Sequence, residues 1–84
     1  MTRYTVVWLR DAIDELGNIW LAAQDRDAVT ATSAEIDREL ASDATAKGKS
    51  LSEGLRVYDA PPLRAVFSVS DPDRTVEVAR VRTL

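Results

Sequence analysis

Three arginines near the end of the chain, Arg64, Arg80 and Arg82, are the residues whose type and spacing best fit a chemical role. They fall at the ends, away from the connecting turn, of two predicted strands, residues 63–70 and 75–82, in which apolar and polar residues alternate. Because such ends are neighbours in an antiparallel pair, the three guanidiniums must either face water or bind an anion. The sequence therefore suggests an anion-binding site at this end of the hairpin.

The pairing register of this hairpin decides whether the arginines can act together. If Ser70 pairs with Thr75 across a four-residue loop, Arg64 and Arg80 point to opposite faces. If Ser70 instead pairs with Val76 across a five-residue loop, Arg64 lies opposite Arg82 and all three arginines share a face. The turn, Asp-Pro-Asp-Arg at residues 71–74, suits a tight connection but leaves both registers open. A shared anion site is expected to require the five-residue loop.

The sequence contains neither Cys nor His. This removes thiol nucleophiles, His bases and the usual zinc ligands, so we expect no metal and no cofactor. Catalysis would have to use Lys, Arg, Tyr, Asp or Glu. The Lys47-Gly48-Lys49-Ser50 run is not a phosphate-binding loop, because Asp43 stands where its first glycine is required and a helix rather than a strand precedes it.

Length and charge indicate one domain, residues 1–84, with an uneven charge distribution. Residues 1–46 carry four basic and nine acidic side chains, and residues 47–84 carry seven basic and five acidic side chains. No apolar run approaches the ~20 residues that span a bilayer. The apolar stretch near Met1 is too short for a signal peptide, so the expected location is the cytoplasm, with no membrane partner.

The elements that would position the arginines follow the order β-α-α-β-β-β, an α+β class with a mainly antiparallel sheet. Strands are predicted at 4–9 and 55–59 besides the hairpin, and residues 43–54 as a polar loop. Helices at 11–23, capped by Asp11, and 27–42, capped by Asp25 or Asp27, should form a hairpin on one face of the sheet. Their inner stripes are expected to be Ile13, Leu16, Trp20 and Ala23, widened by Ala12 and Ile19, and then Val29, Ser33, Ile36 and Leu40. Trp8 and Trp20 are expected in the core.

Several motifs in this order resemble the RelE/ParE superfamily of bacterial type II toxins. The N-terminal part matches the family's first strand and helix, Tyr4-Thr5-Val6-Val7-Trp8 followed by Ala12, Leu16 and Ile19. The C-terminal part matches three family stretches, Gly54-Leu55-Arg56, Leu63-Arg64-Ala65-Val66-Phe67-Ser68-Val69 and Val76-Glu77-Val78-Ala79-Arg80-Val81. The resemblance covers nearly the whole chain. It implies a helical hairpin packed on one face of the sheet and a cognate antitoxin that wraps the toxin.

The resemblance also implies two alternative targets. RelE-like members cut mRNA in the ribosomal A site without a metal, and ParE-like members inhibit DNA gyrase. On the positions that match, the implied catalytic residues are Arg64 and Arg80. Lys47, Lys49, Arg56 and Arg82 would bind RNA. Thr83 and Leu84 follow Arg82, where many nuclease members carry Tyr or His, so both targets and a non-catalytic binding module stay open.

RNA cleavage by attack of a 2′-hydroxyl needs proton transfer as well as fixed positive charge. Tyr58, on the strand that also carries Arg56, is the candidate for the proton, since it supplies a hydroxyl near the expected basic face. The alternative for Arg64 and Arg80 is ordinary ion pairing with Glu77, Asp59 or Glu53.

Overall fold

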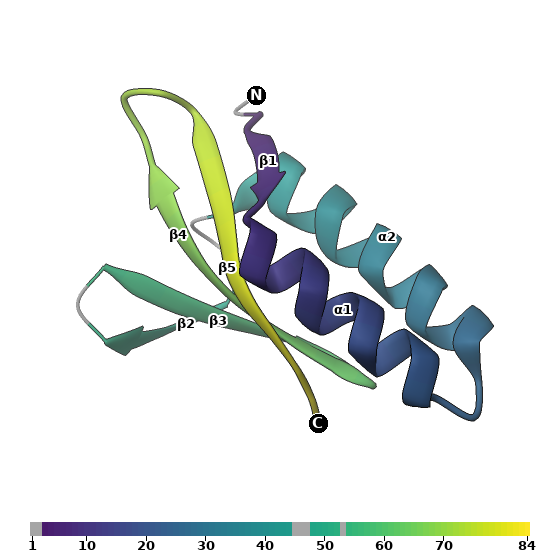
Figure 1. Ribbon diagram of the computed structural model, residues 1–84. Coiled ribbons are helices and arrows are strands. Elements are labelled where there is room, and N and C mark those ends of the chain that lie inside the picture. Colours follow the sequence, from purple (N-terminus) through teal and green to yellow (C-terminus); the bar gives the residue numbers. More distant parts are fainter. Residues whose placement is uncertain (1–2, 45–47, 53) are drawn as a thin grey trace.

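The computed structural model describes residues 3–44, 48–52 and 54–84 (Figure 1). Its elements follow the predicted order, with one additional strand in the segment predicted to be a loop. In chain order they are β1 (Thr5–Trp8), α1 (Arg10–Ala22), α2 (Arg26–Asp43), β2 (Lys49–Ser52), β3 (Leu55–Ala60), β4 (Leu63–Ser70) and β5 (Thr75–Thr83).

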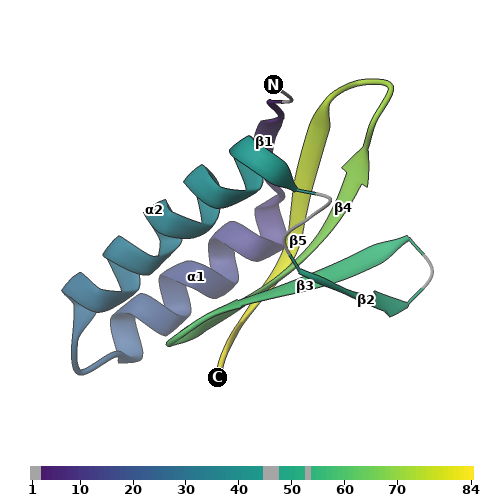
Figure 2. The same cartoon turned by 180° about the vertical axis from the view of Figure 1, so that it is seen from behind.

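The five strands form one sheet in the order β1-β5-β4-β3-β2. β1 runs parallel to β5, and every other neighbouring pair is antiparallel. α1 and α2 lie side by side on one face of the sheet in both views (Figures 1 and 2). This confirms the predicted α+β class with a mainly antiparallel sheet. We call the face under the helices the inner face and the opposite one the outer face.

The strand that the sequence did not predict is β2, at the edge of the sheet. All four of its residues are exposed, so no buried face imposes an alternation of apolar and polar side chains. Backbone pairing with β3 holds this strand in the sheet, and the pairing has a bulge between Ser50 and Ser52. An exposed edge strand therefore had no hydrophobic pattern by which to be found.

The caps of the two helices differ from each other. The Asp25 side chain accepts a hydrogen bond from the Ala28 amide at 3.0 Å and so caps α2, as predicted. Leu9 is the N-cap of α1 and makes no side-chain cap bond. Asp11, the predicted cap, lies instead in the first turn, where its negative charge interacts favourably with the positive end of the helix dipole.

The inner stripe predicted for α1 is rotated relative to the one observed. Ala12 is fully buried, whereas Ile13 and Trp20 are 54% and 38% exposed. The prediction that Trp20 lies in the core is wrong. Its indole Nε1 donates to Thr30 Oγ1 at 3.2 Å, and the Arg26 guanidinium lies 4.6 Å from its ring centre. At the surface the ring keeps its polar N–H satisfied while its body spans α1 and α2.

The core lies between the inner face of the sheet and the two helices. Its largest fully buried side chains are Phe67 and Leu63 of β4, Val76, Val78 and Val81 of β5, and Ile36 and Leu40 of α2. Trp8 packs at its border and donates its indole N–H to Asp37 Oδ1 at 3.1 Å. Within the described residues, neither helix has the length and apolar character to cross a bilayer.

Candidate functional site

The hairpin of β4 and β5 uses both of the registers that the sequence allowed. Near the turn, Ser70 pairs with Thr75 and Phe67 pairs with Val78. At the other end, Val66 pairs with Arg80 and Arg64 pairs with Arg82. The shift falls between Val66 and Phe67, which leaves Ala79 as one extra residue in β5, a β-bulge.

The bulge exists because β5 must keep three valines in the core. Val76, Val78 and Val81 are all buried, and the spacing from 78 to 81 is three rather than two. Strict alternation after Val78 would turn Arg80 inward, so the extra residue restores Val81 to the inner face. The expectation that a shared arginine face requires a five-residue loop is therefore wrong. The loop has four residues, and the bulge supplies the shift.

The register places all three arginines on the outer face. Residues directly opposite each other in a sheet point to the same side, so Arg64 shares a side with Arg82, and Arg80 with Val66. Lys49 pairs with Val57, which pairs with Val66, so Lys49 belongs to the same face. The structure thus gathers four of the sequence-predicted site residues, Lys49, Arg64, Arg80 and Arg82, on one face.

Two other predicted site residues lie on the inner face. Arg56 pairs with the buried Phe67 and Tyr58 pairs with the buried Ala65, so neither shares a side with Arg64. The Arg56 Nη2 donates to the Gly48 carbonyl at 3.2 Å, and the Tyr58 ring packs against the core. The expectation that Tyr58 brings its hydroxyl to the arginine face is therefore not met. Lys47 lies outside the described residues.

Arg64 is held by a carboxylate on the neighbouring strand. Its Nε and Nη2 donate to the two oxygens of Asp59 at 2.6 and 3.0 Å, a bidentate pair between residues directly opposite on β3 and β4. The hydrogen bond from Arg64 lowers the pKa of Asp59, and the same contact raises the pKa of Arg64. Of the three carboxylates that the sequence offered for such pairing, Asp59 is the partner of Arg64.

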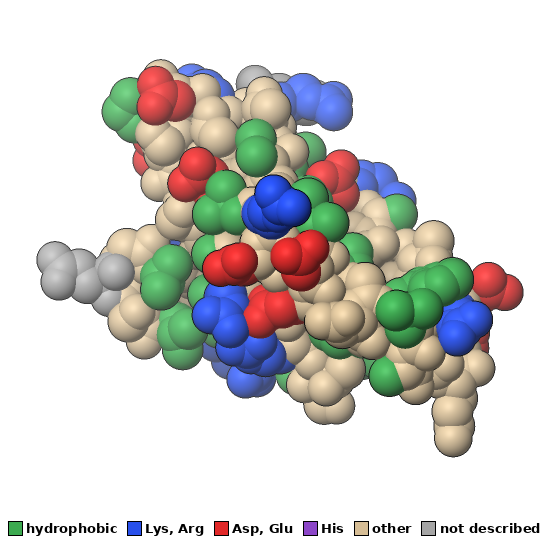
Figure 3. All heavy atoms as spheres, viewed as in Figure 1, with side chains coloured by type: hydrophobic (Ala, Val, Ile, Leu, Met, Phe, Trp, Pro, Cys, Tyr) green, Lys and Arg blue, Asp and Glu red, His purple; other side chains and the backbone are tan. Residues whose placement is uncertain are grey.

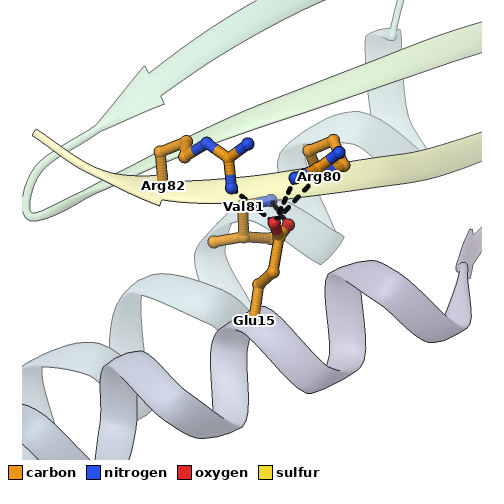
Figure 4. A network of polar contacts seen from close by, with 4 residues as sticks. All are labelled: Glu15, Arg80, Val81 and Arg82. Carbon is orange, nitrogen blue, oxygen red and sulfur yellow. Dashed lines mark hydrogen bonds and ion pairs between the residues drawn. The ribbon is translucent and has the colours of Figure 1, made fainter.

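Arg80 and Arg82 share a different carboxylate, Glu15 of α1 (Figure 4). Arg80 reaches Glu15 Oε2 through Nε at 2.9 Å and through Nη2 at 2.8 Å, and Arg82 donates to the same oxygen through Nη1. The Val81 amide donates to the other oxygen, Oε1, at 2.9 Å. The two arginines lie on either side of Val81 and turn toward α1.

The open edge of β5 makes room for this carboxylate. β1 pairs with Thr75 to Val78, so among the described strands none lies on that side of the rest of β5. α1 runs along it instead (Figure 1), and Glu15 satisfies an edge amide that would otherwise lack a partner. Figure 3 shows acidic side chains gathered over α1 beside basic ones from the neighbouring strand.

Sequence reasoning did not include Glu15 among the possible partners of the arginines. A signal was present, because Glu15 lies three residues after the buried Ala12 and four before the half-buried Ile19. That spacing places a carboxylate on the packing face of the helix, where a charge requires partners.

The network shifts the titration of its members. Hydrogen bonding from Arg80, with further contributions from the Val81 amide and Arg82, lowers the pKa of Glu15 to about 2 against the opposing effect of burial. The Glu15 carboxylate in turn raises the pKa of Arg80. At neutral pH the cluster therefore holds two positive charges and one negative charge, with a net attraction for anions. Among the described residues, no group of acidic side chains could hold a metal ion.

An apolar groove lies between the helices, away from the sheet. Ile13, Leu16, Gly17 and Trp20 of α1 line it together with Val29, Thr30 and Ser33 of α2. A Cβ placed on Gly17 would meet no atom within 4 Å. This glycine therefore leaves open space in the groove and is not needed for close packing of the two helices.

The fold of the chain matches solved structures, whereas its sequence matches no known family model. No family model matches the chain, and no curated protein does. A chain of the RelBE2 toxin–antitoxin complex from Mycobacterium tuberculosis aligns with a TM-score of 0.83 at 21% identity, over 100% of this chain and 94% of that one. A chain of the chromosomal ParDE toxin–antitoxin system from Pseudomonas aeruginosa aligns with a TM-score of 0.76 at 18% identity, over 98% and 97%.

A third structure extends the comparison. The conserved hypothetical protein HP0892 from Helicobacter pylori aligns with a TM-score of 0.62 at 14% identity, over 95% of this chain and 93% of that one. The chain therefore has the RelE-like α+β fold, which it shares with these structures.

Proposed function

We propose that this chain is the toxin component of a type II toxin–antitoxin pair. The observation that carries the proposal is the gathering of Arg64, Arg80, Arg82 and Lys49 on the outer face of a RelE-like sheet. The fold supports it, because two structural neighbours come from toxin–antitoxin systems. The chain would act in the cytoplasm, where its targets are.

The target that this face fits best is mRNA on the ribosome. Guanidiniums bind phosphate oxygens in a fixed fork, and they stabilise the charge that develops when a 2′-hydroxyl attacks a phosphodiester. Arg64 and Arg80 would contact the reacting phosphate. Arg82 and Lys49, on the same face, would hold the neighbouring ones. Such a nuclease would work without a metal.

The antitoxin would occupy the apolar groove between the helices. A disordered segment can fold as an amphipathic helix when its apolar side chains enter such a groove. The exposed Ile13 and Trp20 give this surface the apolar area that a folding segment needs to bury. The toxin would then be held inactive until its partner is degraded.

Inhibition of DNA gyrase is the second candidate, and the position of Tyr58 favours it. With Tyr58 on the inner face, the outer face binds anions through the arginines without that hydroxyl as a proton donor. A surface that binds without cleaving would suit a stoichiometric inhibitor. In this case the same arginines would contact gyrase or its DNA.

Expression and coexpression in cells, followed by two assays of the purified chain, separate these candidates. Expression without a partner should arrest growth, and coexpression with a short gene adjacent in the genome should relieve the arrest and give a copurifying complex. Cleavage of mRNA in a ribosome-containing translation extract supports the nuclease. Growth arrest with intact mRNA and inhibited supercoiling by purified gyrase supports the second candidate. Absence of growth arrest would overturn the toxin assignment and leave a binding module.

A further inference from the structure

The cluster around Glu15 has the composition of an oxyanion site that is already filled. Three guanidinium N–H groups and one backbone amide converge on two oxygen atoms, from Arg80, Arg82 and Val81. This set of donors is the kind that binds a phosphate, and a carboxylate presents oxygens with the same charge and similar spacing. The donors all come from one strand of the sheet, whereas the anion comes from a helix.

The exposure of the partners shows which group can be exchanged. The side chains of Arg80 and Arg82 are 48% and 52% exposed, so a dissolved anion can reach their guanidiniums. The Glu15 side chain is only 20% exposed, because it lies between α1 and β5. α1 is anchored independently by Ala12 and Ile19, so moving the Glu15 carboxylate aside requires a change of side-chain rotamer and no movement of the helix.

We propose that Glu15 is an internal competitor that occupies a phosphate site formed by Arg80, Arg82 and the Val81 amide at the open edge of β5, and that it must be displaced when RNA binds. Arg64 is outside this contact because Asp59 holds it separately. The contact lowers the affinity of the free chain for phosphodiesters and limits binding to targets that offer several phosphates at once. The involvement of RNA rests on the proposed function. The anion site itself rests only on the geometry around Val81.

The test compares Glu15→Gln with Asp14→Asn. Both changes remove one negative charge from α1, but Asp14 makes no hydrogen bond or ion pair with Arg80 or Arg82 within the described residues. Gln keeps the size of Glu and its oxygen can still accept from Val81, so the fold is preserved. The first probe is inorganic phosphate, titrated at constant ionic strength while the thermal unfolding midpoint is followed. The second probe is a short fluorescent single-stranded RNA.

Glu15→Gln should bind both probes roughly tenfold more tightly than the wild type, the size of one charge-assisted contact. Asp14→Asn should change either affinity by less than about twofold, as expected of a screened charge. The gain should disappear when Arg80→Ala is combined with Glu15→Gln. Glu15→Asp, which keeps the charge on a side chain shorter by one methylene, should give a smaller gain.

An equal gain for Glu15→Gln and Asp14→Asn would overturn the proposal, because the effect would then be one of net charge. Unchanged affinity in a folded Glu15→Gln protein would overturn it too, and would make the contact purely structural. Either failure can occur while the wild type still arrests growth, which leaves the toxin assignment intact. Conversely, a gain for phosphate in a chain that does not arrest growth would support the anion site and count against the toxin.

Discussion

Arg64 and Arg82 are direct cross-strand partners, yet their guanidiniums are held by carboxylates on two different elements, Asp59 of β3 and Glu15 of α1. Like charges directly opposite each other in a sheet are destabilising. Because each carboxylate pairs with a different arginine, the repulsion between the two neighbouring guanidiniums is offset in the folded chain. An anion that bridges both arginines would have to compete with both carboxylates.

Replacing Arg64 tests the chemistry of the outer face. If the chain cleaves RNA, Arg64→Ala should lower the rate by roughly 10²–10³, the scale of removing one preorganised donor. Arg64→Lys should not restore it, because an ammonium cannot reproduce the bidentate fork. The measurement is the rate of mRNA cleavage in a translation extract. Arg38→Ala, on the exposed side of α2, is the matched control and should cleave at the wild-type rate.

Tyr58→Phe tests the role that sequence reasoning gave to this hydroxyl. Because Tyr58 lies on the inner face, opposite to Arg64, we expect the variant to cleave RNA at the wild-type rate. The same extract assay decides the matter. A loss of cleavage of 10²-fold or more, in the range of general acid–base catalysis, would restore Tyr58 as the proton donor.

The Glu15 network should make stability depend on acid. The folded pKa of Glu15, about 2, lies below its ordinary value of 4.5, so the unfolded chain binds more protons between these limits. The stabilisation is therefore complete above pH 4.5 and is lost as the pH falls toward 2. The Arg partners are half exposed, so screening reduces the contribution to roughly 1–2 kcal/mol.

Urea unfolding of the wild type and Glu15→Gln at pH 7 and at pH 3 measures this contribution. The gap in free energy of unfolding between the two proteins should be wider at pH 7 than at pH 3. If the difference in free energy of unfolding between the two proteins is the same at pH 7 and at pH 3, the negative charge of Glu15 does not stabilise the folded chain.

Two glycines with the same backbone conformation should respond differently to alanine. Gly48 and Gly54 have φ of 82° and 79°, the left-handed region that costs an L-residue ~1–2 kcal/mol. A Cβ on Gly48 would also lie 2.6 Å from the Val57 carbonyl oxygen and 3.1 Å from the Phe67 ring, whereas one on Gly54 meets nothing within 4 Å. Gly48→Ala should therefore destabilise clearly more than Gly54→Ala. Equal midpoints in thermal unfolding would contradict the close approach of β3 to Gly48.

Gly17→Ala should stabilise the chain. Gly17 lies inside α1 with open space around it, so alanine gains about 0.5–1 kcal/mol of helix propensity at no steric cost. The midpoint of thermal unfolding should rise. A fall would mean that the groove between α1 and α2 is narrower than the structure indicates.

Periodicity was sufficient to predict the elements that bury a face. α2 shows the apolar repeat of a helix and β4 alternates regularly, and the predicted bounds of α2, β4 and β5 agree with the structure within two residues. β2 buries nothing and had no pattern to follow. The stripe of α1 was misplaced because Ile13 and Trp20 are apolar residues that line an exposed groove.

The candidate site was only partly predictable, because its geometry depends on one residue. The types of Arg64, Arg80 and Arg82 were informative, but their common face required the bulge at Ala79. The triplet Val76, Val78 and Val81 carried that information as a break in the alternation. The pairing of Arg80 with Glu15 spans 65 residues and could not be seen from local spacing.

The parallel pairing of β1 with β5 constrains the order in which the chain can assemble. Thr5 of β1 pairs with Thr75 of β5, 70 residues later in the sequence, so β1 cannot join the sheet until β5 is available. Until then β1 remains an unpaired edge, and the segment Val6 to Trp8 exposes its apolar side chains. The sheet is therefore completed only after residues 5 to 78 have all been synthesised. A chain in which β5 is not yet in place therefore lacks the outer-face cluster of Arg64, Arg80 and Arg82.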